Sequence, residues 1–289
     1  MSKYGIIRQV TAKWVIAMKL LSLKMPYQAE WIIETDCSEI IARLEMKYGR
    51  YISECGEYRH SDIKILKNDA ADYVVTIKDS VTRTAHPIFH LNHFLFENPT
   101  YSDAVFALHG AAVQWGEKCY VFLASTTTGK TTLTSYLTQC GFGYLTDDCV
   151  LLERSSYTVH PFFTPLHLRE GGMRVLQAYH ALPPQLSQLA EPNGGCRYVY
   201  TPKNTVECSV PLGEIFFLER TEKENALLPM TATDKLTALL QSPIKVYPIT
   251  AEYLRFLANL GKNHCKRLKY CDMDFVKEVL LQHAANASI

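Results

Sequence analysis

The chain has 289 residues, of which 47% are hydrophobic and 20% charged, so it can bury the core of one large domain or two small ones. A balance of 30 basic and 29 acidic residues leaves a net charge of +1, which argues against nucleic acid or an anionic membrane surface as a partner. The 9 cysteines are scattered without a Cys-x-x-Cys pair, so we expect no zinc knuckle, no disulfide framework and a reducing, cytoplasmic location.

The N-terminal part of the sequence predicts a small β-rich domain. The apolar stretch Trp14–Met25 is interrupted by Lys19 and Lys24 and is too short to span a bilayer, so we expect core and not a signal segment. Short strands with a helix among them are expected from the runs Ile32-Ile33, Ile40-Ile41, Asp62–Leu66 and Tyr73–Ile77. We assign residues 1–85 to this domain and residues 86–289 to a second domain.

A helix is predicted over Pro87–Asn98, with a proline in its first turn and Pro99 just beyond its end. His86, His90 and His93 fall on one face of this helix, a spacing that could bind zinc. The apolar residues interleaved with them favour a packed helix instead.

From about residue 105 the sequence predicts alternating strands and helices, which is typical of an α/β domain. Two strands joined at Trp115–Glu117 form a hairpin, and Gly141 ends the following helix as a left-handed cap. The predicted strands are Phe106–Gln114, Lys118–Ala124, Gly143–Glu153 and Pro211–Glu219, and a turn is expected over Arg154–Tyr157. The predicted helices are Lys130–Cys140, Thr233–Gln241, Ala251–Leu260 and Asp274–His283.

The segment Ala124–Thr131 (ASTTTGKT) matches a phosphate-binding loop whose first glycine is replaced by alanine. In such a loop Gly129 lets the backbone approach phosphate oxygens, Lys130 neutralises the β- and γ-phosphates, and the Thr131 hydroxyl reaches Mg²⁺. The predicted nucleotide-binding residues are Ser125, Thr126, Thr127, Thr128, Gly129, Lys130, Thr131 and Thr132.

A pair of carboxylates, Asp147-Asp148, follows in a stretch too apolar for a solvated turn. Adjacent residues of a strand point to opposite faces, so one carboxylate is expected to face a metal ion and the other an acceptor hydroxyl. His109, one hairpin before the loop, is a further candidate for the same site.

These motifs, in this order and at near-identical spacing, resemble the kinase domain of the HPr kinase/phosphorylase family. The shared elements are His109-Gly110, the phosphate loop, the helix that follows it, Gly141 and Asp147-Asp148. The resemblance implies a P-loop-containing α/β nucleotide-binding fold shared with phosphoenolpyruvate carboxykinases, and an ATP- and Mg²⁺-dependent kinase acting on a hydroxyl. It implies Asp147 as the base, Thr131 and Asp148 as metal ligands and His109 as their support, with the two aspartates also able to exchange roles.

The chain departs from the family in the segment His167–Gly172, where His167 stands in place of a metal-site glutamate and Glu170 is displaced. Glu170 is the candidate second metal ligand, and whether phosphorolysis occurs is left open. The chain is more similar to divergent HPr-kinase-like proteins, some of which phosphorylate ribosomal peptide natural products such as lasso-peptide precursors. In them a basic residue often precedes a strand like Pro211–Glu219, which makes Arg197, and after it Lys203, the candidate phosphate contact. An ordinary surface arginine is the alternative.

We therefore expect a kinase of a serine or threonine hydroxyl in a peptide or protein, with the N-terminal domain recognising the acceptor. A kinase of a small metabolite such as free serine, or a nucleotide sensor without transfer, fits the same motifs. Members of the family are often oligomers, so a homo-oligomer is a further expectation. The basic run Lys262–Lys269 is expected to be a solvated face.

Overall fold

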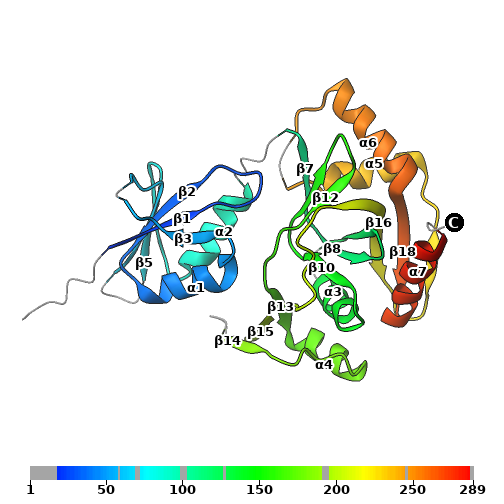
Figure 1. Ribbon diagram of the computed structural model, residues 1–289, viewed down its shortest axis with the longest axis horizontal. Helices are drawn as coiled ribbons and strands as arrows, with labels where there is room; N and C mark the ends of the chain where they lie inside the picture. Colours follow the sequence, from blue (N-terminus) through cyan, green and yellow to red (C-terminus); the bar gives the residue numbers. More distant parts are fainter. Residues whose placement is uncertain are drawn as a thin grey trace, which may run out of the picture.

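The computed structural model describes residues 18–57, 59–68, 72–97, 103–125, 128–190, 195–244 and 247–286. These residues form a mixed α/β structure in which a smaller N-terminal domain lies beside a larger C-terminal domain (Figure 1). No disulfide joins any of the cysteines in these described ranges. In the part of the chain described, no helix is long and apolar enough to cross a membrane.

The N-terminal domain is a six-stranded sheet of order β3-β1-β2-β4-β5-β6 with two helices packed against it. Its pairs are antiparallel except β2 with β4. One face of the sheet is buried, as the alternating exposure of β5 shows. The elements are β1 (Lys19–Leu23), β2 (Trp31–Thr35), α1 (Ser38–Tyr48), β3 (Ile52–Glu54), β4 (Ile63–Lys67), β5 (Tyr73–Ile77), β6 (Ser80–Thr84) and α2 (Pro87–Glu97).

The prediction of a strand at Ile40-Ile41 is wrong, because these residues lie in helix α1. The buried residues of α1 are Ile40, Leu44 and Tyr48, four residues apart, so they share one face of a helix. A pair of isoleucines is too short a run to distinguish this helical period from a strand.

Helix α2 confirms the prediction over residues 87–98. It packs in the N-terminal core through Leu91 and Leu95, so this packed unit extends beyond the division predicted at residue 85. His86 is exposed and His90 is half-buried, and the side chain of His93 lies outside the described residues. The packed helix is therefore the better description.

The C-terminal domain is built on one long sheet with the order β10-β8-β9-β16-β12-β11-β7, and β18 also pairs with β16. Strand β16 runs parallel to β9 and β18, whereas the other pairs along this order are antiparallel. A separate three-stranded sheet has the order β13-β15-β14. The strands are β7 (Val105–Leu108), β8 (Gly110–Trp115), β9 (Lys118–Leu123), β10 (Gly143–Thr146), β11 (Val150–Glu153), β12 (Thr158–His160), β13 (Leu166–Arg169), β14 (Ser187–Ala190), β15 (Cys196–Tyr200), β16 (Val210–Arg220), β17 (Ala226–Leu228) and β18 (Cys265–Tyr270). The helices are α3 (Lys130–Gln139), α4 (Glu170–Ala178), α5 (Ala232–Gln241), α6 (Ala251–His264) and α7 (Met273–Asn286).

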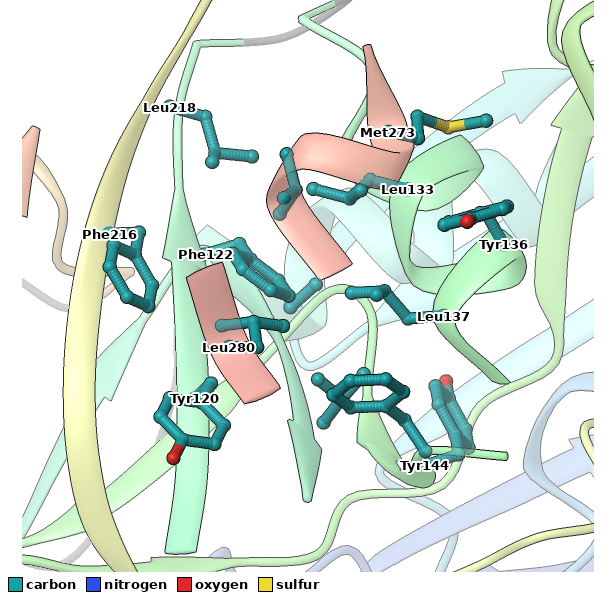
Figure 2. Close-up of a cluster of buried hydrophobic side chains, with 14 of the residues drawn as sticks. Tyr120, Phe122, Leu133, Tyr136, Leu137, Tyr144, Phe216, Leu218, Met273 and Leu280 are labelled. Carbon is teal, nitrogen blue, oxygen red and sulfur yellow. The ribbon is translucent and has the colours of Figure 1, made fainter. Parts of the chain in front are cut away.

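Both faces of the long sheet are buried, which explains its continuous apolar strands. On one face Phe122 and Phe216 pack against Leu137 of α3 and Leu280 of α7 (Figure 2). On the other face the alternate strand residues pack against helices α5 and α6, at the opposite side of the domain from α3 (Figure 1). Strand β9, which leads into the predicted phosphate loop, is thus buried in the sheet between β8 and β16.

Two strands predicted to be continuous are each broken in two. The run over residues 106–114 is interrupted at His109, and the run over residues 143–153 is interrupted at Asp147-Asp148, which lie in a bend. The segments before and after these breaks pair separately, β7 with β11 and β8 with β10. The two breaks therefore fall at the same level of the sheet and bring His109 to the aspartates.

Several secondary-structure predictions for this domain are confirmed, whereas the basic run over residues 262–269 is not the solvated face predicted, because Cys265 and Leu268 are buried in strand β18. The β8–β9 hairpin closes at Trp115 and Lys118, with Gly116 at φ 60°. Gly141 has φ 96° after the end of α3, as a left-handed cap requires. The turn over residues 154–157, the strand β16 and the helices α5, α6 and α7 lie where they were predicted.

Candidate active site

The predicted phosphate loop joins the central strand β9 to the first turn of helix α3. Gly129 caps this helix in a left-handed conformation with φ 98°, which side chains with a Cβ rarely adopt. A Cβ at this position would lie 3.3 Å from the Tyr270 hydroxyl, which itself donates a hydrogen bond of 3.1 Å to the carbonyl of Thr128. The left-handed conformation therefore favours glycine here, and the Tyr270 hydroxyl leaves little room for a Cβ.

Lys130 lies at the start of α3 with its ammonium folded over the loop. It donates hydrogen bonds to the carbonyl of Ala124 at 2.7 Å and to the carbonyl of Ser125 at 3.3 Å. Thr128 contacts Ser125 as well, with 3.0 Å between their hydroxyls. The ammonium and the helix N-terminus thus lie together, as an anion site needs.

The remaining predicted loop residues divide into two groups. Thr126 and Thr127 lie outside the described residues. Thr132 lies against helix α4, since a Cβ on Gly172 would come within 2.7 Å of the Thr132 hydroxyl. Its role in nucleotide binding stays a prediction.

Asp147 is the most buried of the candidate site carboxylates, with 5% of its surface exposed. Thr131 donates a hydrogen bond of 2.7 Å to its Oδ2, while its buried Oδ1 has no hydrogen-bond partner in the structure described. Burial raises the pKa of Asp147 well above its usual range, and the neighbouring charge of Asp148 adds to this, against the opposing effects of Thr131 and Lys130. An unpartnered oxygen of this kind suits a cation ligand.

Asp148 is half-buried and faces a different set of groups. The side chain of His109 forms a hydrogen bond with the backbone of Asp148. The backbone N–H of His109 donates a hydrogen bond of 2.9 Å to the carbonyl of Ser242. Partial burial and then the charge of Lys130 lower the pKa of His109, while Asp148 opposes this shift. The prediction that the two aspartates have different surroundings agrees with this geometry, although they lie in a bend and not in a strand.

The small sheet carries His167 and Arg197 to the same region. Antiparallel pairing places Val199 opposite His167 and Arg197 opposite Arg169, so His167 and Arg197 share one face. Burial first, and then the charges of Lys47 and Arg197, lower the pKa of His167 to about 4, against the opposing effect of Asp148. Its Nε2 is buried without a hydrogen-bond partner in the described structure, so His167 is neutral at physiological pH.

Glu170, the predicted second metal ligand, lies exposed in the first turn of α4. Its carboxylate is 3.7 Å from the guanidinium of Arg174, one turn along the same helix. Lys203, the second candidate phosphate contact, is exposed. Neither residue is among the charges that act on Asp147.

Lys47 of helix α1 is a site residue that the sequence did not indicate. It is half-buried, and its ammonium interacts electrostatically with Asp148 and Arg197. Burial raises the pKa of Tyr48, the next residue in the chain, and the charge of Asp148 raises it further. The last turn of α1 in the N-terminal domain is therefore near enough to Asp148 for their charges to interact.

The donor set fits magnesium in its chemistry. Mg²⁺ prefers oxygen ligands and keeps several waters, so one or two carboxylates with a hydroxyl and phosphate oxygens are enough. Thr131 and the orphaned oxygen of Asp147 are such donors, with Asp148 beside them. No cluster of three His, Cys, Asp or Glu side chains that could bind a metal occurs in the described ranges.

Comparison with models of protein families gives no match, and neither does comparison with curated proteins. Among solved structures, the chain is similar to the HPr(Ser) kinase/phosphatase from Coxiella burnetii, at 13% sequence identity and a TM-score of 0.30. That similarity covers 61% of this chain and 97% of the other.

Proposed function

We propose that the protein is an ATP- and Mg²⁺-dependent kinase that phosphorylates a serine or threonine hydroxyl of a peptide or protein. The observation that carries the proposal is the hydrogen bond from Thr131 to Asp147. It joins a phosphate-loop hydroxyl to a buried carboxylate, with Lys130 and Asp148 close enough to act on the same group. Such a set provides both the phosphate cradle and the carboxylates that phosphoryl transfer needs.

Thr131 and Asp147 would hold Mg²⁺, which supplies charge neutralisation on the phosphates when it is bound. Lys130 leaves the loop carbonyls and binds the β- and γ-phosphates. Asp148, which lies closer to the groups of the N-terminal domain, accepts the proton of the acceptor hydroxyl. The acceptor oxygen forms a bond to the γ-phosphorus as the bond from this phosphorus to the β–γ bridging oxygen breaks, and the electron pair leaves on ADP. Either aspartate could be the base and the other the metal ligand. The contact of Thr131 with Asp147 favours Asp147 as the metal ligand and Asp148 as the base.

The position of the N-terminal domain supports a peptide or protein as acceptor. This domain adjoins Asp148 through α1, so a chain bound along it would reach the proposed base. A precursor of a ribosomal peptide natural product, such as a lasso-peptide precursor, is one acceptor of this class. A small metabolite such as free serine is the alternative within the same chemistry.

A nucleotide sensor without transfer is the alternative of another class. A sensor would also need Asp147 to hold Mg²⁺, so the kinase is favoured instead by Asp148, a second carboxylate whose charge acts on Asp147 and which nucleotide binding alone does not require.

The proposal is tested by transfer of label from [γ-³²P]ATP to a panel of peptides, proteins and amino acids. The wild type is expected to label at least one acceptor, and Lys130→Ala and Asp148→Asn to lose about 100-fold or more of that activity. Lys67→Ala, which changes an exposed lysine of strand β4, is the matched control and is expected to retain it. Binding of ATP by the wild type without transfer to any acceptor would establish the sensor, and the absence of ATP binding would refute both.

A further inference from the structure

Strand β16 continues past the point where the predicted phosphate loop leaves the sheet. Leu123, the last residue of β9, is paired with Phe217, and β16 runs parallel to it and extends further, to Arg220. Strand β18 pairs with this extension, so that Tyr270 lies opposite Arg220. Ligands of open α/β sheets bind beyond the carboxyl ends of the parallel strands. The end of β16 therefore belongs to the edge of the sheet at which a nucleotide is expected.

The alternation of side chains along β16 gives the face on which Arg220 lies. Phe216 and Leu218 pack with helix α3 in one core cluster (Figure 2). Residues two apart in a strand share a face, so Arg220 lies on this same face, beyond the apolar cluster. Glu219 lies on the other face, where Lys269 is 3.5 Å from its carboxylate. The neighbouring carboxylate is thus engaged by another cation.

The guanidinium of Arg220 lies close to the backbone of the loop. A Cβ built on Gly129, the residue that caps α3, would lie 3.9 Å from Nη1 of Arg220. The same point would lie 3.3 Å from the hydroxyl of Tyr270, which donates a hydrogen bond to the carbonyl of Thr128. The backbone N–H of Thr221 donates a hydrogen bond of 2.9 Å to the carbonyl of Tyr270, so the end of β16 is fixed beside the loop.

The surroundings of Arg220 suit an anion that carries a metal ion. Arg220 is exposed, and within the described ranges its guanidinium has no hydrogen bond or ion pair. Two other sources of positive charge, the N-terminus of α3 and the ammonium of Lys130, lie at the same loop. The first turn of α3 also carries Thr131, which contacts Asp147, and Oδ1 of Asp147 is buried without a hydrogen-bond partner in the described structure. A nucleotide with its Mg²⁺ matches both the cations and this oxygen.

We propose that Arg220 binds the diphosphate of the nucleotide from the side of strand β16. This inference rests on the proposed kinase function and adds to it a residue that contacts the phosphate donor. In a phosphate loop the backbone N–H groups surround the α- and β-phosphates, and Arg220 approaches this backbone at Gly129. A guanidinium offers parallel N–H groups to a phosphate, whereas the ammonium of Lys130 acts as a point charge on the β- and γ-phosphates. Arg220 therefore contacts MgADP and MgATP alike.

The test measures the dissociation constant of MgADP by calorimetry for the full chain and its variants. Arg220→Met removes the charge and keeps an unbranched side chain, and we expect it to weaken binding about 10- to 100-fold, the size of one charge-assisted contact. Arg220→Lys is expected to weaken binding less, and Arg220→Glu more, because a carboxylate repels phosphate. Arg255→Met changes an exposed arginine of helix α6, which packs on the other face of the sheet. It is the matched control and is expected to bind MgADP like the wild type.

Binding of MgADP by Arg220→Met as tightly as by the wild type would overturn the role of Arg220 and leave the kinase proposal intact. Equal losses in the Lys, Met and Glu variants of Arg220 would overturn a contact with phosphate, because the charge would then make no difference. A wild type that does not bind MgADP would overturn the kinase proposal itself. Urea unfolding of each variant shows whether it is folded. If Arg220→Met is not, Arg220→Gln takes its place and the same outcomes decide.

Discussion

Replacement of His167 by glutamine should remove a large part of the loss of stability in acid. The pKa of His167 is lowered to about 4 from 6.5 in the folded protein, because its ring is buried and lies near the charges of Lys47 and Arg197. Between these values the unfolded chain binds the proton and the folded chain does not, so the free energy of unfolding falls as the pH falls through 6.5 toward 4. At about pH 5 this linkage is worth about 2 kcal/mol relative to about pH 7.5.

The assay is urea unfolding of the wild type and His167→Gln at these two pH values. The wild type is expected to lose about 2 kcal/mol more than the variant between them. Other groups titrate in the same range, including Asp147 with the opposite sign, but they contribute to both proteins and cancel in the difference. The exposed histidine His60 gives the matched control His60→Gln, which should follow the wild type. Equal losses in the wild type and His167→Gln would refute the neutral, buried state inferred for His167.

Three further predictions concern the aspartate, the loop and the domain contact. Asp147→Asn should raise the free energy of unfolding near neutral pH, because folding raises the pKa of Asp147. This gain in stability should vanish as the pH falls to 3.8, and urea unfolding at several pH values checks it. Gly129→Ala should cost about 1–2 kcal/mol of stability and weaken ATP binding, measured by calorimetry, because φ is 98°. Arg50→Ala should cost about 1 kcal/mol in urea unfolding and more than Arg59→Ala, because both ion pairs, with Glu207 and Glu30 respectively, are exposed but Arg50 also packs on the Phe163 ring; equal costs would contradict a docking role for Arg50.

The parts of the site that depend on neighbours in sequence were predictable. Gly129 and Lys130 follow an apolar strand and precede a helix, and the glycine requirement at φ 98° is a property of the backbone alone. Gly141 and the two-residue turn after Trp115 are local in the same sense. Each needs no knowledge of what the rest of the chain does.

The strand breaks at His109 and Asp147-Asp148 could not be predicted from neighbouring residues in the sequence. A sheet buried on both faces gives continuous apolar runs, so the periodicity is the same whether a run is one strand or two. The breaks follow from pairing between segments about 40 residues apart, β7 with β11 and β8 with β10. That pairing, and not the local sequence, places Asp147 in contact with Thr131. It places Asp148 where it interacts with Lys47 of the N-terminal domain.

Lys47 had no local indication at all, since it is one of 30 basic residues and lies near the end of an amphipathic helix. Its place beside Asp148 depends on how Arg50 and Tyr51 dock on Phe162 and Phe163. If the surroundings of Asp148 depend on domain docking, Arg50→Ala should lower kinase activity, although the contacts of Arg50 are with Glu207, Thr205 and Phe163. Unchanged activity in Arg50→Ala, together with a measurable loss of stability, would show that docking and transfer are independent.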